Sequence, residues 1–202
     1  LKVLSLFSGC GGMDLGFEGD FIAPFKSVAT CPEWIERRLD DDWVHLKPTN
    51  FSLVFANDIL KEAALTWTRF MKQYGYEPSI YRTESIVDLV KQHRNGGNVF
   101  PDNVDVVVGG FPCQDFSVAG KRKGFDSMRT HDGKLRAGDL PTEETRGKLY
   151  YWMKEVIDIT KPKIFIAENV KGLVNMGQVK DIIQADFSHA DGNGYIVLSP
   201  QV

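Results

Sequence analysis

The stretch "DVVVGGFPCQDF", residues 105–116, indicates both a fold and a site. Three consecutive valines without polar alternation are typical of a strand buried on both faces, as in a parallel sheet. The two following glycines clear side chains from the end of this strand, and Pro112 restricts the backbone before Cys113. Because ligands of open parallel sheets bind beyond the carboxyl ends of the strands, the thiol is predicted to face the ligand side.

The composition fits one soluble globular domain. The chain has 202 residues, of which 43% are hydrophobic and 25% charged, and its net charge is −3. No apolar run approaches the roughly 18 residues that span a membrane, and "LKVLSLFSGC" lacks the layout of a signal peptide, so we expect no membrane partner. The three cysteines and four histidines are scattered, which predicts no metal site and no disulfide framework and favours a reducing cytoplasm.

Short apolar runs alternate with amphipathic segments. Strands are predicted at residues 2–7, 52–58, 105–110, 162–170 and 194–199, and helices at 59–74, 84–93, 145–160 and 176–190. This order predicts an α/β fold with a Rossmann-like, mostly parallel sheet and helices on both faces, in one domain over residues 1–202. Two polar segments with weak periodicity, 19–50 and 126–144, are predicted as long irregular insertions.

A second glycine-rich segment, "FSGCGG" at residues 7–12, follows the first predicted strand. Its glycines allow a nucleotide-type cofactor to approach the backbone, although a tight strand-to-helix turn explains them as well. The segment is neither a dinucleotide fingerprint, because Asp14 stands where the last glycine is required, nor a phosphate-binding P-loop. Asp58, at the end of the second strand, could accept hydrogen bonds from ribose hydroxyls or cap the following helix.

Cys113 and Glu168 are the candidates for chemistry. Lys121, Arg122 and Lys123 follow the cysteine and could favour its thiolate, although a basic run is often only a solvated face. Glu168 ends a strand that we expect beside the Cys113 strand, where burial would keep the carboxyl protonated and able to donate to a ring nitrogen. A thiol beside such an acid suits addition to an electron-poor heterocycle.

Together, "LFSGCGG", "GGFPCQDFS" with "AGKRKGF", and "ENVKGL" resemble, in this order, the motifs of cytosine-C5 DNA methyltransferases. The PCQ and ENV pair is the specific part of this resemblance. It implies the S-adenosylmethionine-dependent methyltransferase fold and methyl transfer to C5 of a cytosine flipped out of duplex DNA, with S-adenosylhomocysteine as product. Cys113 would attack C6 of the base, Glu168 would contact N3 and the exocyclic amine, and Asn169 would hold the loop unless it only caps a helix.

The resemblance also implies roles for other residues. The cofactor-binding residues would be Phe7, Ser8, Gly9, Cys10, Gly11, Gly12, Asp58, Ile59, Gly110 and Pro112. A DNA-contacting loop would carry Gln114, Ser117, Lys121, Arg122 and Lys123. The implied protein is a DNA (cytosine-5-)-methyltransferase of a restriction-modification system. We expect a monomer in the bacterial cytoplasm, with a cognate restriction endonuclease that it does not contact.

Three features depart from the family pattern. An acid expected near "ESI" is either Glu84 or is replaced by Ser85, and the spacing from the glycine loop to Asp58 is long. The chain ends at "YIVLSPQV", before the "QxRxR" block, the target-recognition region and a final helix that completes the cofactor site. We therefore expect these residues alone to be inactive. A tRNA cytosine-C5 methyltransferase and a non-catalytic regulatory module of the same fold remain alternatives, and a dehydrogenase is a weaker one.

Overall fold

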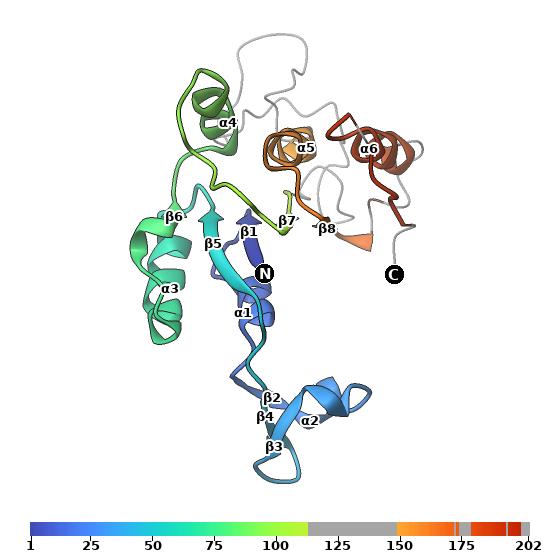
Figure 1. The fold of residues 1–202 in the computed structure, drawn as a ribbon. Coiled ribbons are helices and arrows are strands. Elements are labelled where there is room, and N and C mark those ends of the chain that lie inside the picture. Colours follow the sequence, from blue (N-terminus) through green and yellow to red (C-terminus); the bar gives the residue numbers. More distant parts are fainter. Residues whose placement is uncertain (113–148, 172, 174–178, 193, 199–202) are drawn as a thin grey trace.

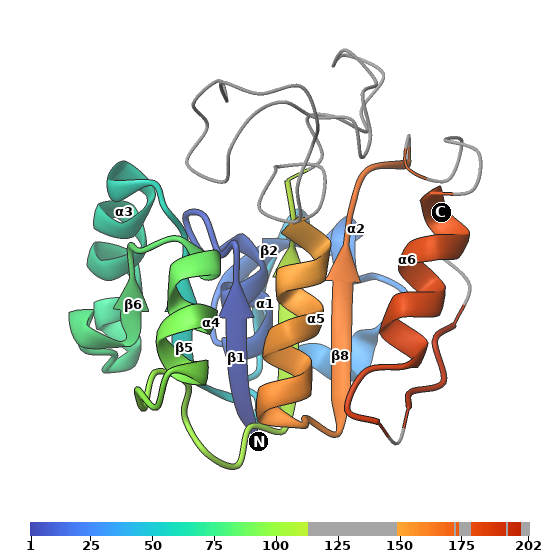
Figure 2. The same cartoon turned by 90° about the horizontal axis from the view of Figure 1, so that it is seen from above.

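A five-stranded parallel sheet forms the centre of the molecule. The computed structural model describes residues 1–112, 149–171, 173, 179–192 and 194–198 (Figure 1). The strands, in the spatial order β6-β5-β1-β7-β8, are β1 (Lys2–Leu6), β5 (Ser52–Asn57), β6 (Tyr81–Arg82), β7 (Val106–Gly110) and β8 (Ile164–Glu168). All four pairings between these strands are parallel. The predicted α/β class and parallel sheet are therefore confirmed, and the carboxyl ends of the strands meet at one edge (Figure 2).

Helices cover both faces of this sheet. One face carries α1 (Gly12–Glu18) and α3 (Lys61–Met71), and the other carries α4 (Ile86–Arg94), α5 (Leu149–Thr160) and α6 (Val179–Ser188) (Figures 1 and 2). Short helical turns complete the order: α2 (Phe25–Val28), η1 (Pro32–Trp34), η2 (Lys72–Tyr74) and η3 (Pro78–Ile80). The four predicted helices thus correspond to α3 to α6.

Strand β1 shows why its sequence carries no polar alternation. Leu4 and Leu6 belong to the core beneath α4 and α5, whereas Val3 belongs to the core beneath α3. All three side chains are buried, and burial stabilises the fold by about 1.5–3 kcal/mol for each such aliphatic side chain. Ser5 is the polar residue among the buried residues of this strand. Its hydroxyl donates a hydrogen bond to the Asp14 carboxylate of α1.

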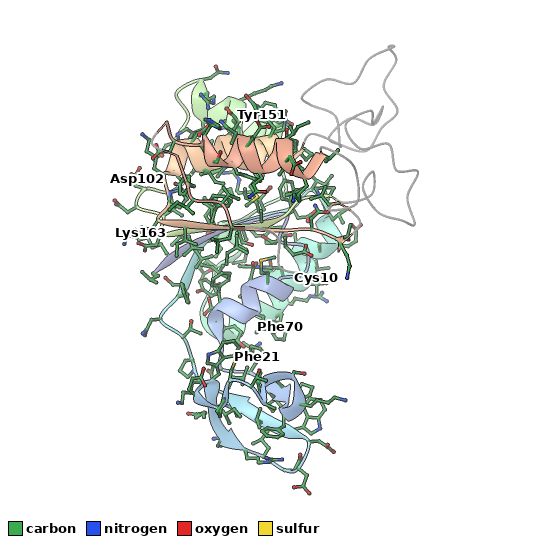
Figure 3. All side chains as sticks on the ribbon, turned by 90° about the vertical axis from the view of Figure 1, so that its right-hand side faces the viewer. Cys10, Phe21, Phe70, Asp102, Tyr151 and Lys163 are labelled. Atoms are coloured by element: carbon green, nitrogen blue, oxygen red, sulfur yellow. The ribbon has the colours of Figure 1, made fainter. Side chains whose placement is uncertain are left out.

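The segment 19–50 was predicted to be irregular, and this is wrong, whereas its being an insertion stays a prediction. It forms a three-stranded antiparallel sheet, β2-β4-β3, from β2 (Ile22–Pro24), β3 (Ile35–Arg38) and β4 (Trp43–Leu46). Its own small core contains Ala23, Val28, Val44 and Leu46. Strands of three or four residues are too short for a visible period, which explains the wrong prediction. This sheet lies beyond α1, with Phe21 at its near end (Figure 3).

The last two predicted strands also differ from expectation. Residues 194–198 form no strand, and within them Ile196 and Leu198 are 94% and 77% exposed. Strand β8 exists but lies at an edge of the sheet, where Ile164 and Ile166 are 58% and 45% exposed instead of buried. Phe165 between them packs against Phe187 on the α6 side. Among the described residues, no helix is long and apolar enough to cross a membrane.

Candidate active site

The strand that leads to Cys113 and the strand that ends in Glu168 are neighbours, as predicted. Strands β7 and β8 pair in parallel with Gly110 opposite Glu168, so both chains reach the same edge of the sheet together. Cys113 follows Gly110 by three positions and lies outside the described residues, so its role stays a prediction. The same holds for the predicted insertion at 126–144 and for the DNA-contacting residues Gln114, Ser117, Lys121, Arg122 and Lys123.

The two glycines before Phe111 serve different purposes. A Cβ on Gly109 would lie 3.1 Å from Met153 Sδ and 3.3 Å from Leu6 Cβ, so this glycine lets α5 and β1 approach β7 closely. A Cβ on Gly110 would lie 3.0 Å from a carboxylate oxygen of Glu168. Only the second glycine therefore clears space toward the candidate catalytic acid, whereas the first is required by packing.

Asn169 connects β8 to the backbone that precedes Cys113. Its Nδ2 donates to the carbonyl of buried Phe111 at 3.0 Å, and its Oδ1 accepts from the Val170 amide at 2.9 Å. A helix-start cap does not account for the first of these bonds, because a capping side chain accepts a hydrogen bond, whereas here the Asn169 side chain donates one. The contact with Phe111 agrees with the loop-holding role that the resemblance implies.

Glu168 itself is exposed, so the burial that was expected around its carboxyl is not found among the described residues. The cause is the position of β8 at the edge of the sheet, where α1 and α3 do not extend beneath it (Figure 1). Its carboxylate lies beside the bare Cα of Gly110. Glu168 is thus placed to meet a ligand at the sheet edge, while water still reaches it.

The glycine loop after β1 has a backbone that few other sequences could adopt. Phe7, Gly9 and Gly11 have positive φ values of 54°, 53° and 90°. A Cβ on Gly11 would lie 2.7 Å from Trp67 Cδ1, so only glycine fits there. No described heavy atom lies within 4 Å of a Cβ placed on Gly9 or Gly12. The tight-turn explanation therefore covers Gly11, whereas the space at Gly12 is left open for a ligand.

Cys10 is exposed within this loop and lies on the α1 side of the sheet (Figure 3). Ser8 continues the pairing of β1 with β5, because its amide donates to the Asn57 carbonyl at 2.8 Å. Its hydroxyl donates to the Ser5 carbonyl at 3.1 Å. Phe7 packs partly on the core beneath α4 and α5 and is half-buried.

Asp58 links the end of β5 to the glycine loop. One carboxylate oxygen accepts from the Gly9 amide at 3.1 Å, and the other accepts from the Leu60 amide at 3.0 Å. Leu60 is the N-cap of α3, so Asp58 shapes the turn before the helix instead of capping the helix directly. The side chain is half-buried and Ile59 beside it is exposed, which leaves both accessible to a ligand.

Two residues that the sequence analysis missed support this corner of the sheet. The hydroxyl of Tyr81 donates to the Gly9 carbonyl at 2.9 Å, and burial, with the nearby Asp58 carboxylate, raises the pKa of Tyr81. Buried Asn57 donates to the carbonyls of Arg82 and Glu84 at 2.9 and 2.8 Å. Asn57 could have been found in the sequence, because a polar amide at the end of an apolar strand indicates a structural or ligand-binding role. The role of Tyr81 is visible only in the structure, from its hydrogen bond to Gly9.

The structure also separates the two candidates in "ESI". Ser85 is the N-cap of α4, and its hydroxyl accepts from the Val87 amide. The side chain of Glu84 pairs with Arg82, whose guanidinium holds the pKa of that carboxyl below its usual range. Ser85 thus has a structural role, and Glu84 is the carboxylate at the carboxyl end of β6.

Comparison with known proteins gives the same picture. The Type II methyltransferase M.NgoFVII of Neisseria gonorrhoeae is 32% identical over 198 residues, covering 97% of this chain and 37% of that protein. The Type II methyltransferase M.BsuRI of Bacillus subtilis is 31% identical over 194 residues, covering 94% of this chain and 37% of that protein. The DNA (cytosine-5-)-methyltransferase M.ApeKI of Aeropyrum pernix is 30% identical over 196 residues, with 93% and 33% covered. This chain therefore spans about a third of the length of these relatives.

A solved structure of a DNA modification methyltransferase encoded within an E. coli prophage has the same fold. Its TM-score is 0.51 at 21% identity, and the match covers 93% of this chain and 38% of that one. The family model described as C-5 cytosine-specific DNA methylase matches residues 1–198. Since this match includes the glycine loop, the β7 end and the β8 end, the chain belongs to the C-5 cytosine-specific DNA methylase family.

Proposed function

We propose that the protein transfers a methyl group from S-adenosylmethionine to C5 of cytosine in duplex DNA. The observation that carries the proposal is the pairing of β7 with β8, which brings Glu168 opposite Gly110 at the edge where the Cys113 segment begins. Asn169 adds to it by holding the Phe111 carbonyl, two residues before the thiol. The names of the relatives, Type II methyltransferases and a DNA (cytosine-5-)-methyltransferase, support the same reaction.

The residues at the β1 and β5 ends fit an adenosyl cofactor. The loop is open at Gly9 and Gly12, Asp58 offers carboxylate oxygens for ribose hydroxyls, and exposed Ile59 offers an apolar contact for the adenine. Phe7, Ser8, Cys10 and Gly11 would complete this wall, with Gly110 and Pro112 nearer the methionine end. S-adenosylmethionine supplies an electrophilic methyl group when it is bound there.

The protein side chains act on the cytosine. Addition of the Cys113 thiolate to C6 forms a C–S bond and shifts electrons to C5, which becomes the nucleophile for the methyl group. Glu168 stabilises the electron-rich ring through N3 and the exocyclic amine, and a flipped base over this carboxyl would also displace its water. Loss of the C5 proton then expels the Cys113 thiolate and restores the C5–C6 double bond.

The substrate would be double-stranded DNA, as the resemblance implies. Because C6 is inaccessible inside a duplex, the target base would leave the stack to enter the site. Lys121, Arg122 and Lys123, with Gln114 and Ser117, would contact the DNA around the extruded base. We place the protein as a monomer in the bacterial cytoplasm, within a restriction-modification system whose endonuclease it does not contact.

A trapping experiment tests the proposal. The protein at its full natural length is incubated with S-adenosylmethionine and a duplex containing 5-fluorocytosine, because fluorine at C5 prevents the proton loss that releases the thiol. A covalent complex should survive denaturing electrophoresis, and Cys113→Ala should abolish it. An adduct with 5-fluorocytidine-containing tRNA but not with any DNA would instead indicate the tRNA enzyme. The absence of both adducts, in a protein that binds the cofactor, would indicate a non-catalytic module.

A further inference from the structure

A buried carboxylate lies beneath the glycine loop and has no part in the proposed chemistry. Asp14 of α1 is fully buried, although an isolated charge in the interior is costly. Its two oxygens each accept one hydrogen bond, from Ser5 Oγ at 2.5 Å and from Trp67 Nε1 at 2.6 Å. Burial raises the pKa of Asp14, while these two bonds oppose the increase.

The indole that Asp14 binds lies directly against the loop. Trp67 of α3 is fully buried, and its Cδ1 and Nε1 would be 2.7 and 3.1 Å from a Cβ on Gly11. Its ring centroid is also 5.2 Å from that of Tyr81, whose hydroxyl donates to the Gly9 carbonyl. Trp67 therefore touches the loop at Gly11 and supports the residue that holds Gly9.

Simple core packing does not explain this arrangement. Apolar side chains in place of Asp14 and of its two donors, Ser5 and Trp67, would fill the same space without a buried carboxylate, and replacing every member of a buried polar cluster in this way is often neutral or stabilising. What only a hydrogen-bond acceptor can do is select one orientation of the indole. The orientation matters here because the indole edge is the surface on which Gly11 rests.

We propose that Asp14 and Trp67 are positioning residues for the cofactor loop. Asp14 fixes the orientation of the Trp67 indole, and the indole keeps Gly9 and Gly11 in the left-handed backbone conformation that opens the loop to the cofactor. The proposal rests on the proposed function for the identity of the ligand. It assigns the pair an effect on cofactor affinity, with little effect on the rate of the chemical step.

Three substitutions separate positioning from packing. Trp67→Phe keeps a buried aromatic ring but removes the N–H donor, and Asp14→Ala removes the acceptor. Asp14→Asn is the rescue variant, because its Oδ1 can accept from the indole while its Nδ2 donates to Ser5 Oγ. Phe187→Leu is the matched control, since it opens the core on the opposite face of the sheet and touches neither the loop nor the pair.

Two measurements on the full-length protein decide the proposal. Calorimetric titration with S-adenosylhomocysteine should give a Kd about tenfold higher for Trp67→Phe and Asp14→Ala, and within about threefold of wild type for Asp14→Asn. Amide hydrogen exchange in the peptide covering residues 7–12 should accelerate in the first two variants only. Phe187→Leu should lower Tm and change neither readout.

Variants that lose thermal stability as Phe187→Leu does, with unchanged exchange at residues 7–12, would overturn the positioning role. The exchange measurement needs no ligand, so it decides the role of the pair even if the wild-type protein does not bind S-adenosylhomocysteine. Failure of the wild type to bind would contradict the proposed function alone. The two hypotheses can therefore fail separately.

Discussion

The two halves of the carboxyl edge of the sheet are supported in different ways. At the β1, β5 and β6 ends, the loop is held by buried or half-buried side chains, with Asp14, Trp67, Tyr81 and Asp58 each bonded to it or to one another. At the β7 and β8 ends, Glu168 is exposed, and the described side-chain link is the bond from Asn169 to Phe111.

This difference separates preorganisation for a cofactor from readiness for a substrate. The half that we propose to bind the cofactor has its shape without a ligand, because its hydrogen bonds are made within the chain. In the half that we propose to be catalytic, the Glu168 carboxylate is exposed among the described residues, so a bound base would supply part of its environment. The following predictions, from the largest expected effect on stability to the smallest, test this contrast.

Gly11→Ala should have the largest effect. The new Cβ would meet Trp67 at 2.7 Å in a backbone with a φ of +90°, and we expect a loss of about 2–4 kcal/mol in the free energy of unfolding. Urea denaturation measures this loss. Gly12→Ala is the control, because a Cβ there has open space, and its free energy of unfolding should stay within about 0.5 kcal/mol. Equal losses in both variants would contradict the role of the Trp67 contact.

The paired variants Gly109→Ala and Gly110→Ala distinguish packing from catalysis. Gly109→Ala crowds Met153 and Leu6 and should lower the free energy of unfolding by about 1–3 kcal/mol. Gly110→Ala meets only the mobile end of the Glu168 side chain, so stability should hardly change. Displacing that carboxylate should nevertheless lower kcat by about 10- to 100-fold in full-length enzyme. A stable Gly110→Ala variant with normal kcat would show that the position of Glu168 is not critical.

Asn169→Ala removes the described link in the catalytic half. The loss of its bond to the Phe111 carbonyl should lower the free energy of unfolding by about 0.5–1.5 kcal/mol. Because the bond holds the backbone before Cys113, single-turnover methylation should slow, while the affinity for S-adenosylhomocysteine should stay unchanged. Weaker cofactor binding with a normal single-turnover rate would mean that the two halves are not separable in this way.

The smallest expected effect is a pH dependence from Asp14. Its pKa in the folded state is raised above the usual 3.8, so the folded protein holds this proton more tightly than the unfolded chain does. The contribution to stability is therefore greatest at low pH and falls as pH rises from 3.8 through the raised pKa. Asp14→Asn removes this dependence. Urea denaturation across acidic and neutral pH measures the free energy of unfolding of both proteins. As pH rises, the free energy of unfolding of the wild type should fall relative to that of Asp14→Asn.

Much of the fold followed from local patterns. The apolar runs "KVLSL" and "VVV" predicted buried parallel strands, and each was found in the interior of the sheet, with a strand on both sides. Segment 19–50 was missed because its strands are short and its core consists of a few side chains brought together by pairing. Strand β8 was predicted to be buried, but it lies at the edge of the sheet. The apolar residues of a strand do not determine which helices or strands pack against it.

The candidate site divides in the same way. The residues at the strand ends, including the glycine loop, Asp58, Glu168 and Asn169, were predicted because ligand sites in parallel sheets occur where the strands stop. Trp67 and Tyr81 were not predicted, because they are 53 and 72 positions from the residues that they bond. No local pattern distinguishes an aromatic residue that supports a loop from one that only fills a core.

The sequence by itself determined strands β1, β5, β7 and β8, helices α3 to α6 and the chemical groups at the strand ends, because short-range periodicity and turn residues act over a few positions of the chain. Only the tertiary structure decided that Gly109 serves packing while Gly110 leaves room for Glu168, and that Asp14 orients the indole beneath Gly11. Such roles depend on distances of about 3 Å between segments far apart in sequence. These distances are set when the sheet and its helices pack together.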